Sequence, residues 1–356
     1  RRDGPPDNPA AWLQVAAQRN ALDGVRTSTR QRALAARAEP PGGERSGTDD
    51  RLALLFACCH PALAPEARLA LILRAVVGLT TPQIARAFLV NESTLAQRIV
   101  RAKRKIVDAG ISLAVPAPDQ LRDRLGDVLA VVYVMFNEGF VSSTGATQDR
   151  DLAADAVWLA GAVATALPHE AEAWGLTALL TIQHARAAAR FDSHGGLVLL
   201  QHQDRSRWDR AAIADGERMI ERAGALRRPG RYQLHAAIAA LHATAPSWER
   251  TDWLQISILY DELARYDPSP VVRLNHAVAH AQLADPADAL ARLETLAGGL
   301  AGYHLFHAVR AELLTTLGRH DEARAANLAA LELTSNTAER RLLTTRLHSH
   351  PLDDGS

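Results

Sequence analysis

Two short helical patterns, separated by three residues, fill the stretch from Gly78 to Ile106, GLTTPQIARAFLVNESTLAQRIVRAKRKI. In the first pattern we predict Thr81 as the N-cap and Pro82 as the first helical residue, because these residue types favour those positions. Asn91 is the predicted N-cap of the second helix. Gly78 is expected to end a preceding helix, since a left-handed glycine commonly does so. The stretch therefore predicts a helix-turn-helix.

The second helix is predicted to have one apolar and one polar face. Its apolar residues are spaced by four, three and four positions, which at about 100° per residue gives a single stripe. They are Leu95, Ile99, Ala102 and Ile106. The opposite face and its flank carry hydroxyl, amide and guanidinium groups, which hydrogen-bond base edges in the major groove of DNA. These candidate DNA-binding residues are Ser93, Thr94, Gln97, Arg98 and Arg101, followed by Lys103, Arg104 and Lys105 as candidates for phosphate contact. The alternative is a solvated amphipathic helix without a ligand.

Charge is distributed unevenly along the 356 residues, although the formal net charge is zero. Residues 1–110 contain 17 Lys and Arg against 10 Asp and Glu, whereas the rest of the chain contains 23 against 30. Nucleic acid attracts clustered cations, so a local excess indicates where it binds. The basic N-terminal part is therefore the candidate for DNA binding, and the acidic C-terminal part is not.

Cysteine usage and apolar runs exclude several other classes of protein. The two cysteines, Cys58 and Cys59, are adjacent in the motif CCHP and give no disulfide framework, which favours a reducing cytoplasm. No second cluster of metal ligands accompanies them, so we expect buried apolar cysteines and neither a metal nor a cofactor. The run VLAVVYVMF is too short to span a membrane, and no signal peptide is visible.

Most of the remaining chain is predicted to be helical, and GGLVLL at residues 195–200 is the main strand signal. Segments 274–296 and 309–331 contain matched positions at a constant offset, which equals the tetratricopeptide period of about 34 residues. The matched positions are Ala277 with Ala311, Leu283 with Leu317, and Ala289 with Ala323. Stacked helical hairpins of this kind offer a concave surface for a protein or small-molecule ligand. We therefore expect an all-α protein, in which a helix-turn-helix DNA-binding domain precedes a helical-hairpin, tetratricopeptide-like C-terminal domain.

Several segments together resemble one protein family. LALLFACCHPALAPEARLALILRAVVGLTTPQIARAFLVNESTLAQRIVRAKRKI resembles the promoter-reading fourth region of an extracytoplasmic-function RNA polymerase sigma factor. NPAAWLQVAAQRNALDGVR resembles the last helices of the second region, which handles the −10 element. The segments VLAVVYVMFNEGF, QDRSRWDRAAIADG, YQLHAAIAALHA and TDWLQISILYDEL are similar to the C-terminal extension of one subgroup. That subgroup joins the sigma regions to tetratricopeptide-like repeats.

The resemblance implies a domain order and two partners, promoter DNA and core RNA polymerase. Residues 1–38 would be a remnant of sigma region 2, 39–50 a linker, 51–110 the region 4 helix-turn-helix domain, 111–120 a linker, 121–250 a helical extension and 251–350 tetratricopeptide-like repeats. Because residue 1 is Arg and most of the second region is missing, we expect the chain to begin inside a longer reading frame. By position, the polar face of the second helix would read the −35 element, and Arg19 and Arg26 would lie near the −10 DNA.

Three functional hypotheses follow. The first is a sigma factor whose C-terminal half regulates it in cis, with the helix containing VLAVVYVMF packing partly on the extension and partly on the helix-turn-helix unit. The second is a helix-turn-helix regulator with a sensory repeat domain. The third is an enzyme in the C-terminal half, where the candidate side chains are His169, His184, His194, His202, Asp204 and Asp209. Since no nucleophile–base pair, phosphate loop or metal spacing accompanies them, we expect no enzyme and interpret QHQDRSRWD as a charge network at a helix junction.

Overall fold

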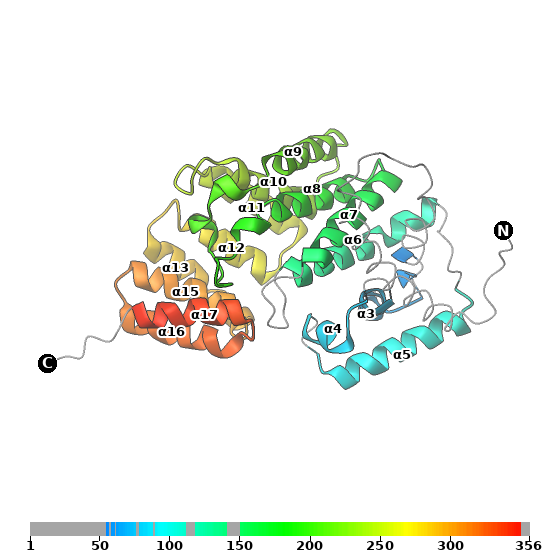
Figure 1. Ribbon diagram of the computed structural model, residues 1–356, viewed down its shortest axis with the longest axis horizontal. Coiled ribbons are helices and arrows are strands. Elements are labelled where there is room, and N and C mark those ends of the chain that lie inside the picture. The colour runs from blue at the N-terminus through cyan, green and yellow to red at the C-terminus, as the bar shows by residue number, and fades with distance from the viewer. Residues whose placement is uncertain are drawn as a thin grey trace. The chain divides into compact units, whose positions relative to one another are not determined.

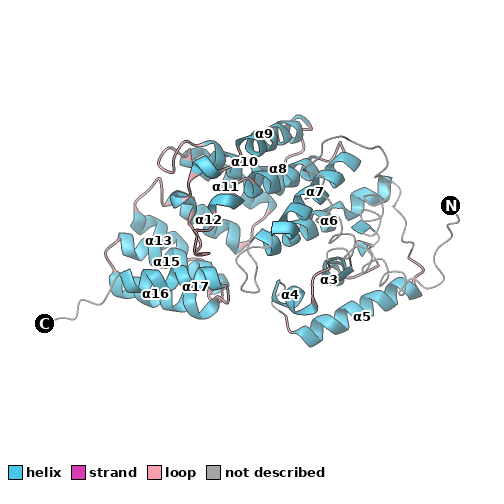
Figure 2. Cartoon of the chain, viewed as in Figure 1, coloured by secondary structure: helices cyan, strands magenta, loops and turns pink. Residues whose placement is uncertain are grey.

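The computed structural model describes residues 55–56, 58–60, 62–75, 78–87, 90–111, 118–140 and 150–349. Regular structure in these ranges consists of α-helices and short 3-10 helices, and the strand signal amounts to an isolated bridge between Phe191 and Leu197 (Figure 2). The prediction of an all-α protein with a helix-turn-helix ahead of a helical C-terminal domain is confirmed. The chain divides into two compact units, residues 1–138 and 139–356, and Figure 1 shows the helices of each.

The first unit contains the helix-turn-helix. Its helices are α3 (Pro65–Ala75), α4 (Thr81–Ala87), α5 (Glu92–Asp108) and α6 (Pro118–Phe140), the last of which ends two residues into the second unit. Gly78 has a φ of +82°, and Leu79 N donates to Leu73 O at 2.9 Å, so the predicted glycine stop after α3 is confirmed. The predicted N-cap Thr81 is instead the first residue of α4, because Ile84 N donates to Thr80 O and Thr80 therefore precedes the helix.

Helix α6 contacts the segment before α3 and α3 itself. Its apolar residues Val128, Leu129 and Phe136 are buried, each at most 2% exposed. The buried Arg124 Nη1 donates to the carbonyl oxygen of Phe56 at 2.9 Å, and Asp127 forms an ion pair with Arg68 of α3. The predicted contact between the VLAVVYVMF helix and the helix-turn-helix unit is therefore present.

The second unit is a succession of helices with short connections. They are α7 (Arg150–Ala166), α8 (Ala171–His184), the 3-10 helices η1 (Ala187–Ala189), η2 (Leu200–His202) and η3 (Arg205–Arg207), then α9 (Arg210–Ala225), α10 (Arg231–Thr244), α11 (Trp253–Tyr266), α12 (Pro270–His280), α13 (Pro286–Glu294), α14 (Ala297–Leu300), α15 (His304–Thr316), α16 (His320–Leu333) and α17 (Thr337–Ser349). Helix α8 lies against α7, α9 and α10. Two glycines permit this close packing. A Cβ on Gly175 of α8 would lie 2.7 Å from Gln233 N of α10, and one on Gly216 of α9 would lie 2.4 Å from Ile182 Cγ1.

The C-terminal helices repeat at the spacing expected from the sequence. Helix α15 follows α12, and α16 follows α13, at the same offset between first residues, and this offset is the tetratricopeptide period. Ala289 and Ala323 hold equivalent positions in α13 and α16 and are both buried, which lets neighbouring helices approach closely. Leu283, by contrast, is 47% exposed and does not belong to the core. The repeat is thus visible in the helix boundaries, and its tetratricopeptide-like character stays a prediction.

Candidate functional site

Helix α5 is fixed at both ends by local hydrogen bonds. Asn91 has extended backbone angles, and its Oδ1 accepts from Ser93 N at 3.1 Å and Thr94 N at 3.4 Å. The predicted N-cap is therefore confirmed. At the other end Gly110 has a φ of +57°, and Ile111 N donates to Ile106 O at 3.1 Å. A left-handed glycine after the last turn satisfies carbonyl groups that the helix leaves free.

The two predicted faces of α5 are present. The apolar stripe is buried against α3 and α4, with exposed fractions of 0% for Leu95, 7% for Ile99, 3% for Ala102 and 1% for Ile106. The predicted DNA-binding residues Ser93, Thr94, Gln97, Arg101, Arg104 and Lys105 are exposed, whereas Arg98 and Lys103 are half-buried. All eight thus reach solvent from a helix whose other side is anchored. Arg19 and Arg26 lie outside the described residues.

The cations of α5 lack acidic partners within the described part of the chain. No Asp or Glu described by the structure forms an ion pair with Arg98, Arg101, Lys103, Arg104 or Lys105. Phosphate binding replaces condensed counterions by protein cations, and it gains most when those cations need not first leave a carboxylate. The surface of α5 therefore has the charge that a polyanion requires.

The structure refines the predicted role of Ser93. Its hydroxyl donates to Asn91 Oδ1 at 2.7 Å, so the hydroxyl proton is engaged in the helix cap. The oxygen retains lone pairs and can accept from a base amino group. We therefore expect Ser93 to contact DNA only as an acceptor, while Gln97 and Arg101, one turn apart, remain full donors.

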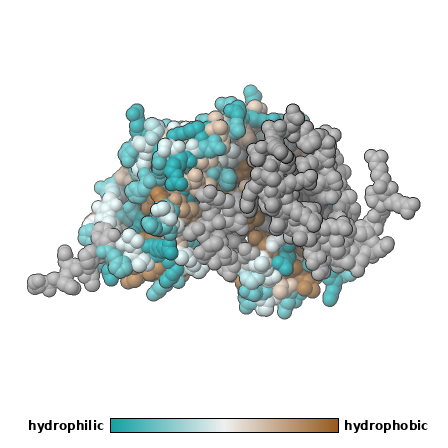
Figure 3. Space-filling view, in the orientation of Figure 1, coloured by the Kyte–Doolittle hydropathy of each residue, from teal (hydrophilic) through white to brown (hydrophobic). Residues whose placement is uncertain are grey.

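One exposed residue on this face was missed by the sequence analysis. Val100 lies one helical turn from both Gln97 and Arg104 and is 57% exposed. Figure 3 shows that the surface of α4 and α5 combines hydrophilic and hydrophobic colours. An exposed apolar group on a recognition helix can contact the methyl group of thymine. Its spacing of three and four residues from polar neighbours was the available signal.

The CCHP motif is an element of the core. Cys58 and Cys59 are both fully buried, as predicted, and desolvation raises the pKa of the Cys58 thiol to about 12. A thiol with such a pKa stays protonated near neutrality, and a protonated thiol is a poor metal ligand. His60 Nδ1 accepts a hydrogen bond from Ala62 N at 3.1 Å, and burial lowers the pKa of His60. The motif therefore stabilises the turn before α3.

QDRSRWD, singled out as an enzyme candidate, forms a helix junction in the second unit. Asp204 Oδ1 accepts from Ser206 N at 2.9 Å, and Asp209 Oδ1 caps α9 by accepting from Ala212 N at 2.9 Å. Arg205 Nη1 donates to the carbonyl oxygens of His242 and Ala245, at 2.7 and 2.8 Å, where α10 ends. These contacts confirm that the segment stabilises a helix junction, but they are bonds to backbone groups and not a charge network, and both carboxylates serve as caps.

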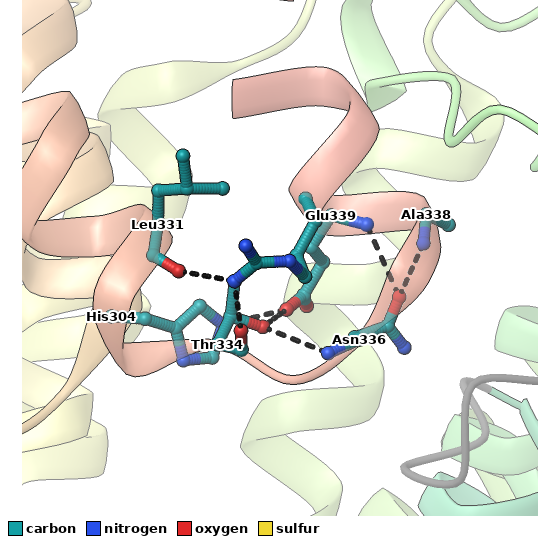
Figure 4. Close-up of polar contacts among 7 residues, drawn as sticks. His304, Leu331, Thr334, Asn336, Ala338 and Glu339 are labelled. Carbon is teal, nitrogen blue, oxygen red and sulfur yellow. Dashed lines mark hydrogen bonds and ion pairs between the residues drawn. The ribbon is translucent and has the colours of Figure 1, made fainter. Parts of the chain in front are cut away.

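A second polar network joins the last three helices (Figure 4). Asn336 Oδ1 accepts from Ala338 N at 2.9 Å and from Glu339 N at 3.1 Å, which caps the start of α17. Glu339 Oε2 accepts from Thr334 Oγ1 at 2.5 Å and lies 3.0 Å from Nε2 of His304. The contacts hold the beginnings of α15 and α17 at the end of α16. Burial alone would raise the pKa of Glu339, but the hydrogen bonds with His304 and Thr334 outweigh it, so the pKa is lowered.

A cavity of about 410 Å³ lies between the 197–202 segment and the C-terminal helices. Leu197 and Leu199 line it on one side, and Glu312, Asn327 and Arg346 on the other. Arg346 Nη2 and Glu312 Oε2, both from lining residues, form an ion pair at 2.7 Å. Of the four histidines named as enzyme candidates, only His202 lines this cavity. The described residues contain no group of three His, Cys, Asp or Glu side chains arranged for a metal ion, and none of their helices has the length and hydropathy to cross a membrane.

Comparison with known proteins agrees with the fold and with α5. Residues 53–106 match the family described as Sigma-70, region 4, and residues 124–224 match a family of unknown function (DUF6596). The fold and the first match define a protein with a sigma-70 region 4 domain followed by a helical C-terminal domain. The chain is 43% identical over 364 residues to the uncharacterized protein R00370 of Rhizobium meliloti (strain 1021), covering 97% of this chain and 85% of that protein. It belongs to the same family as this Rhizobium protein.

Proposed function

We propose that this protein is an RNA polymerase sigma factor that reads the −35 element of its promoters through α5. The observation that carries this proposal is the exposed face of α5. This face has hydroxyl and amide groups in its first two turns and, further along, cations that have no acidic partner among the described residues. A helix-turn-helix places the N-terminal part of its second helix on the bases, so the order of these groups suits the major groove. The match of residues 53–106 to sigma-70 region 4 supports promoter DNA and core RNA polymerase as partners.

Selection from a random DNA pool by the whole chain tests the DNA-binding part of the proposal. We expect enrichment of one short sequence, and fluorescence anisotropy then gives its affinity across a salt series. Each phosphate neutralised contributes a slope of about −0.9 to the plot of log affinity against log salt concentration. Contacts from three of the five cations therefore predict a slope of roughly −3. A pool that stays random after repeated selection would contradict base reading by α5.

Binding of core RNA polymerase separates a sigma factor from the alternative, a helix-turn-helix regulator. We expect the protein expressed with its complete second sigma region to co-elute with core polymerase in size-exclusion chromatography and to be displaced by a second sigma factor. A regulator would bind the selected DNA equally well and elute apart from core polymerase. The proposed contacts of Arg19 and Arg26 with −10 DNA can be tested in the same complex by substituting each with Ala.

We further propose that the second unit regulates the first in cis. Two observations support this role. Residues 1–110 have an excess of cations and the remainder an excess of acids, so a tether keeps opposite charges at a high effective concentration. In addition, α6 belongs to the core of the first unit up to Glu138 and leads directly into the second unit. A protein or small molecule bound by the C-terminal hairpins could then alter promoter activity, and the protein would act in the cytoplasm beside its promoters.

A further inference from the structure

Three helix ends in the second unit meet at a cluster of cationic and aromatic side chains. Arg186 follows the end of α8, Arg205 and Trp208 precede α9, and His242 lies in the last turn of α10. The guanidinium carbon of Arg205 is 4.5 Å from the centre of the Trp208 ring, and that of Arg186 is 5.8 Å from it. The His242 ring packs edge-on at 5.2 Å from Trp253. We call Arg186, Arg205, Trp208 and His242 the arginine–indole cluster.

The cluster is largely removed from water. Arg186 is 8% exposed and Trp208 is 3% exposed, while Arg205 is half-buried. Desolvation and the neighbouring Arg190 and Arg205 lower the pKa of Arg186 to about 9, so it still carries its charge near neutrality. Burial and the neighbouring Arg186 and Arg205 lower the pKa of His242 to about 4, so its ring is neutral near pH 7. Two like charges therefore lie close together in a poorly hydrated environment.

Neither guanidinium group forms an ion pair with an acid described by the structure; Glu249 acts on Arg205 electrostatically without such a pair. The hydrogen bonds of Arg186 and Arg205 go to the Gln183 side chain and to the carbonyl oxygens of His242 and Ala245. Four buried nitrogen atoms have no partner among the described residues: Arg186 Nε, Arg205 Nη2, Trp208 Nε1 and His242 Nδ1. The first three can only donate. Buried donors without an acceptor are costly, and a buried cation without a counter-charge more so.

We propose that the arginine–indole cluster is a binding site for a phosphate group, either the free ion or the phosphate of a small ligand. Two guanidinium groups balance the double negative charge of phosphate, whereas a monocarboxylate would neutralise only one of them. Phosphate oxygens accept the charge-assisted hydrogen bonds that arginine donates, and the indole and imidazole N–H groups supply neutral donors. The site is built by residues that the DNA-binding surface does not use, so this proposal is independent of the sigma-factor proposal.

A purely structural cluster makes a different prediction for Arg186. If Arg186 only stabilises the junction, replacing it with Met lowers the melting temperature of the protein in every buffer. If it holds phosphate, Arg186→Met in phosphate-free buffer melts no lower than the wild type, because an uncompensated buried cation has been replaced by an apolar side chain of similar length. Arg205 is a poorer probe, since its removal also uncaps α10.

Isothermal titration calorimetry of the whole chain with inorganic phosphate tests the proposal, in chloride buffer of constant ionic strength. We expect saturable binding at one site, weakened roughly tenfold or more by Arg186→Met, since a charge-assisted hydrogen bond and its charge are lost. Arg207→Met is the matched control, because Arg207 lies in the same 3-10 helix as Arg205 and is exposed, and it should bind phosphate like the wild type. Equal weakening by both variants, or no saturable binding to the folded wild type, overturns the proposal.

Two further arms complete the test. Methyl phosphate is titrated beside inorganic phosphate; binding of both supports a phosphorylated ligand, and binding of inorganic phosphate alone supports the free ion. If Arg186→Met does not fold, Trp208→Phe decides, because it removes the indole N–H and leaves most of the ring. Several-fold weaker binding by Trp208→Phe supports the site, and unchanged binding refutes it.

Discussion

Gln97 and Arg101 lie one turn apart on the exposed face of α5, and neither side chain has a role in the core. We predict that Gln97→Ala or Arg101→Ala weakens binding to the selected −35 sequence by about 1–3 kcal/mol, the contribution of one bidentate base contact. Folding should be nearly unaffected. Lys105→Ala is the control, since a phosphate contact affects selected and scrambled DNA alike. If the Gln97 and Arg101 variants also lose affinity equally for both DNAs, these residues contact only phosphate.

Val100 offers a test of apolar readout at the same surface. Because its side chain is 57% exposed among polar neighbours, we predict that it contacts a thymine methyl group. Replacing single thymines of the selected sequence with uracil removes one methyl group at a time. At the contacted position this should weaken binding by the wild type and have no effect on Val100→Ala, in anisotropy titrations. A loss of the same size in both proteins would assign the methyl contact to another residue.

His242 makes the stability of the second unit dependent on pH. Its pKa is about 4 in the folded protein, below the ordinary value of 6.5, so the unfolded chain takes up a proton first as the pH falls. This contribution to stability is present above pH 6.5 and is lost towards pH 4, and between pH 7 and pH 5 it amounts to about 2 kcal/mol. Urea titrations in phosphate-free buffer should show that His242→Gln loses about that much less stability over this interval. Parallel pH profiles for the two proteins would contradict the prediction.

At the scale of the element, sequence patterns predicted where a helix forms better than which helices and residues it contacts. The spacing of Leu95 and Ile99 and the cap at Asn91 are local, so α5 could be predicted in detail. The constant offset between the C-terminal segments likewise equals the offset between the helix starts of the hairpins. The contact of Arg124 with the Phe56 carbonyl joins residues 68 positions apart, and no periodicity encodes such a partner. The meeting of Arg186 with Trp208 was missed for the same reason.

The crossing of α8 and α10 depends on Gly175. A Cβ at this position would lie 2.7 Å from Gln233 N and 3.0 Å from Gln233 Cα, and a helix backbone cannot yield as a side chain can. We predict that Gly175→Ala destabilises the protein by about 1–3 kcal/mol, the usual cost of overpacking. Gly161→Ala in α7 is the control, because its Cβ would meet only Thr177 Cγ2 at 3.9 Å. It should gain about 0.5–1 kcal/mol from helix propensity. Urea unfolding measures the free energy of unfolding of both variants. Equal changes in Gly175→Ala and Gly161→Ala would mean that α8 and α10 can separate freely.

At the scale of the whole molecule, the sequence indicated an order of domains that its local patterns could not delimit. We predicted a linker at residues 111–120 and a separate extension from residue 121, and these bounds stay a prediction; in the structure α6 begins at Pro118 and the first compact unit includes it up to Glu138. The reason is physical, since Arg124 and Asp127 of α6 bind the Phe56 carbonyl and Arg68, which lie far earlier in the sequence. A helix that looks like the beginning of one domain can thus be part of the previous one.

Two truncations separate packing from regulation. A chain ending after Ile111 lacks α6, and burying a single large apolar side chain such as that of Phe136 is worth about 1.5–3 kcal/mol. This chain should therefore show a less stable first unit as well as altered transcription. A chain ending after Phe140 keeps α6 and its contacts with Phe56 and Arg68. We predict that it retains the stability of the first unit and, with the complete second sigma region present, changes promoter-directed transcription by core polymerase several-fold, because it lacks the regulatory helices. If ending the chain after Phe140 leaves promoter binding and transcription unchanged across a salt series, the second unit is an independent module on a free tether.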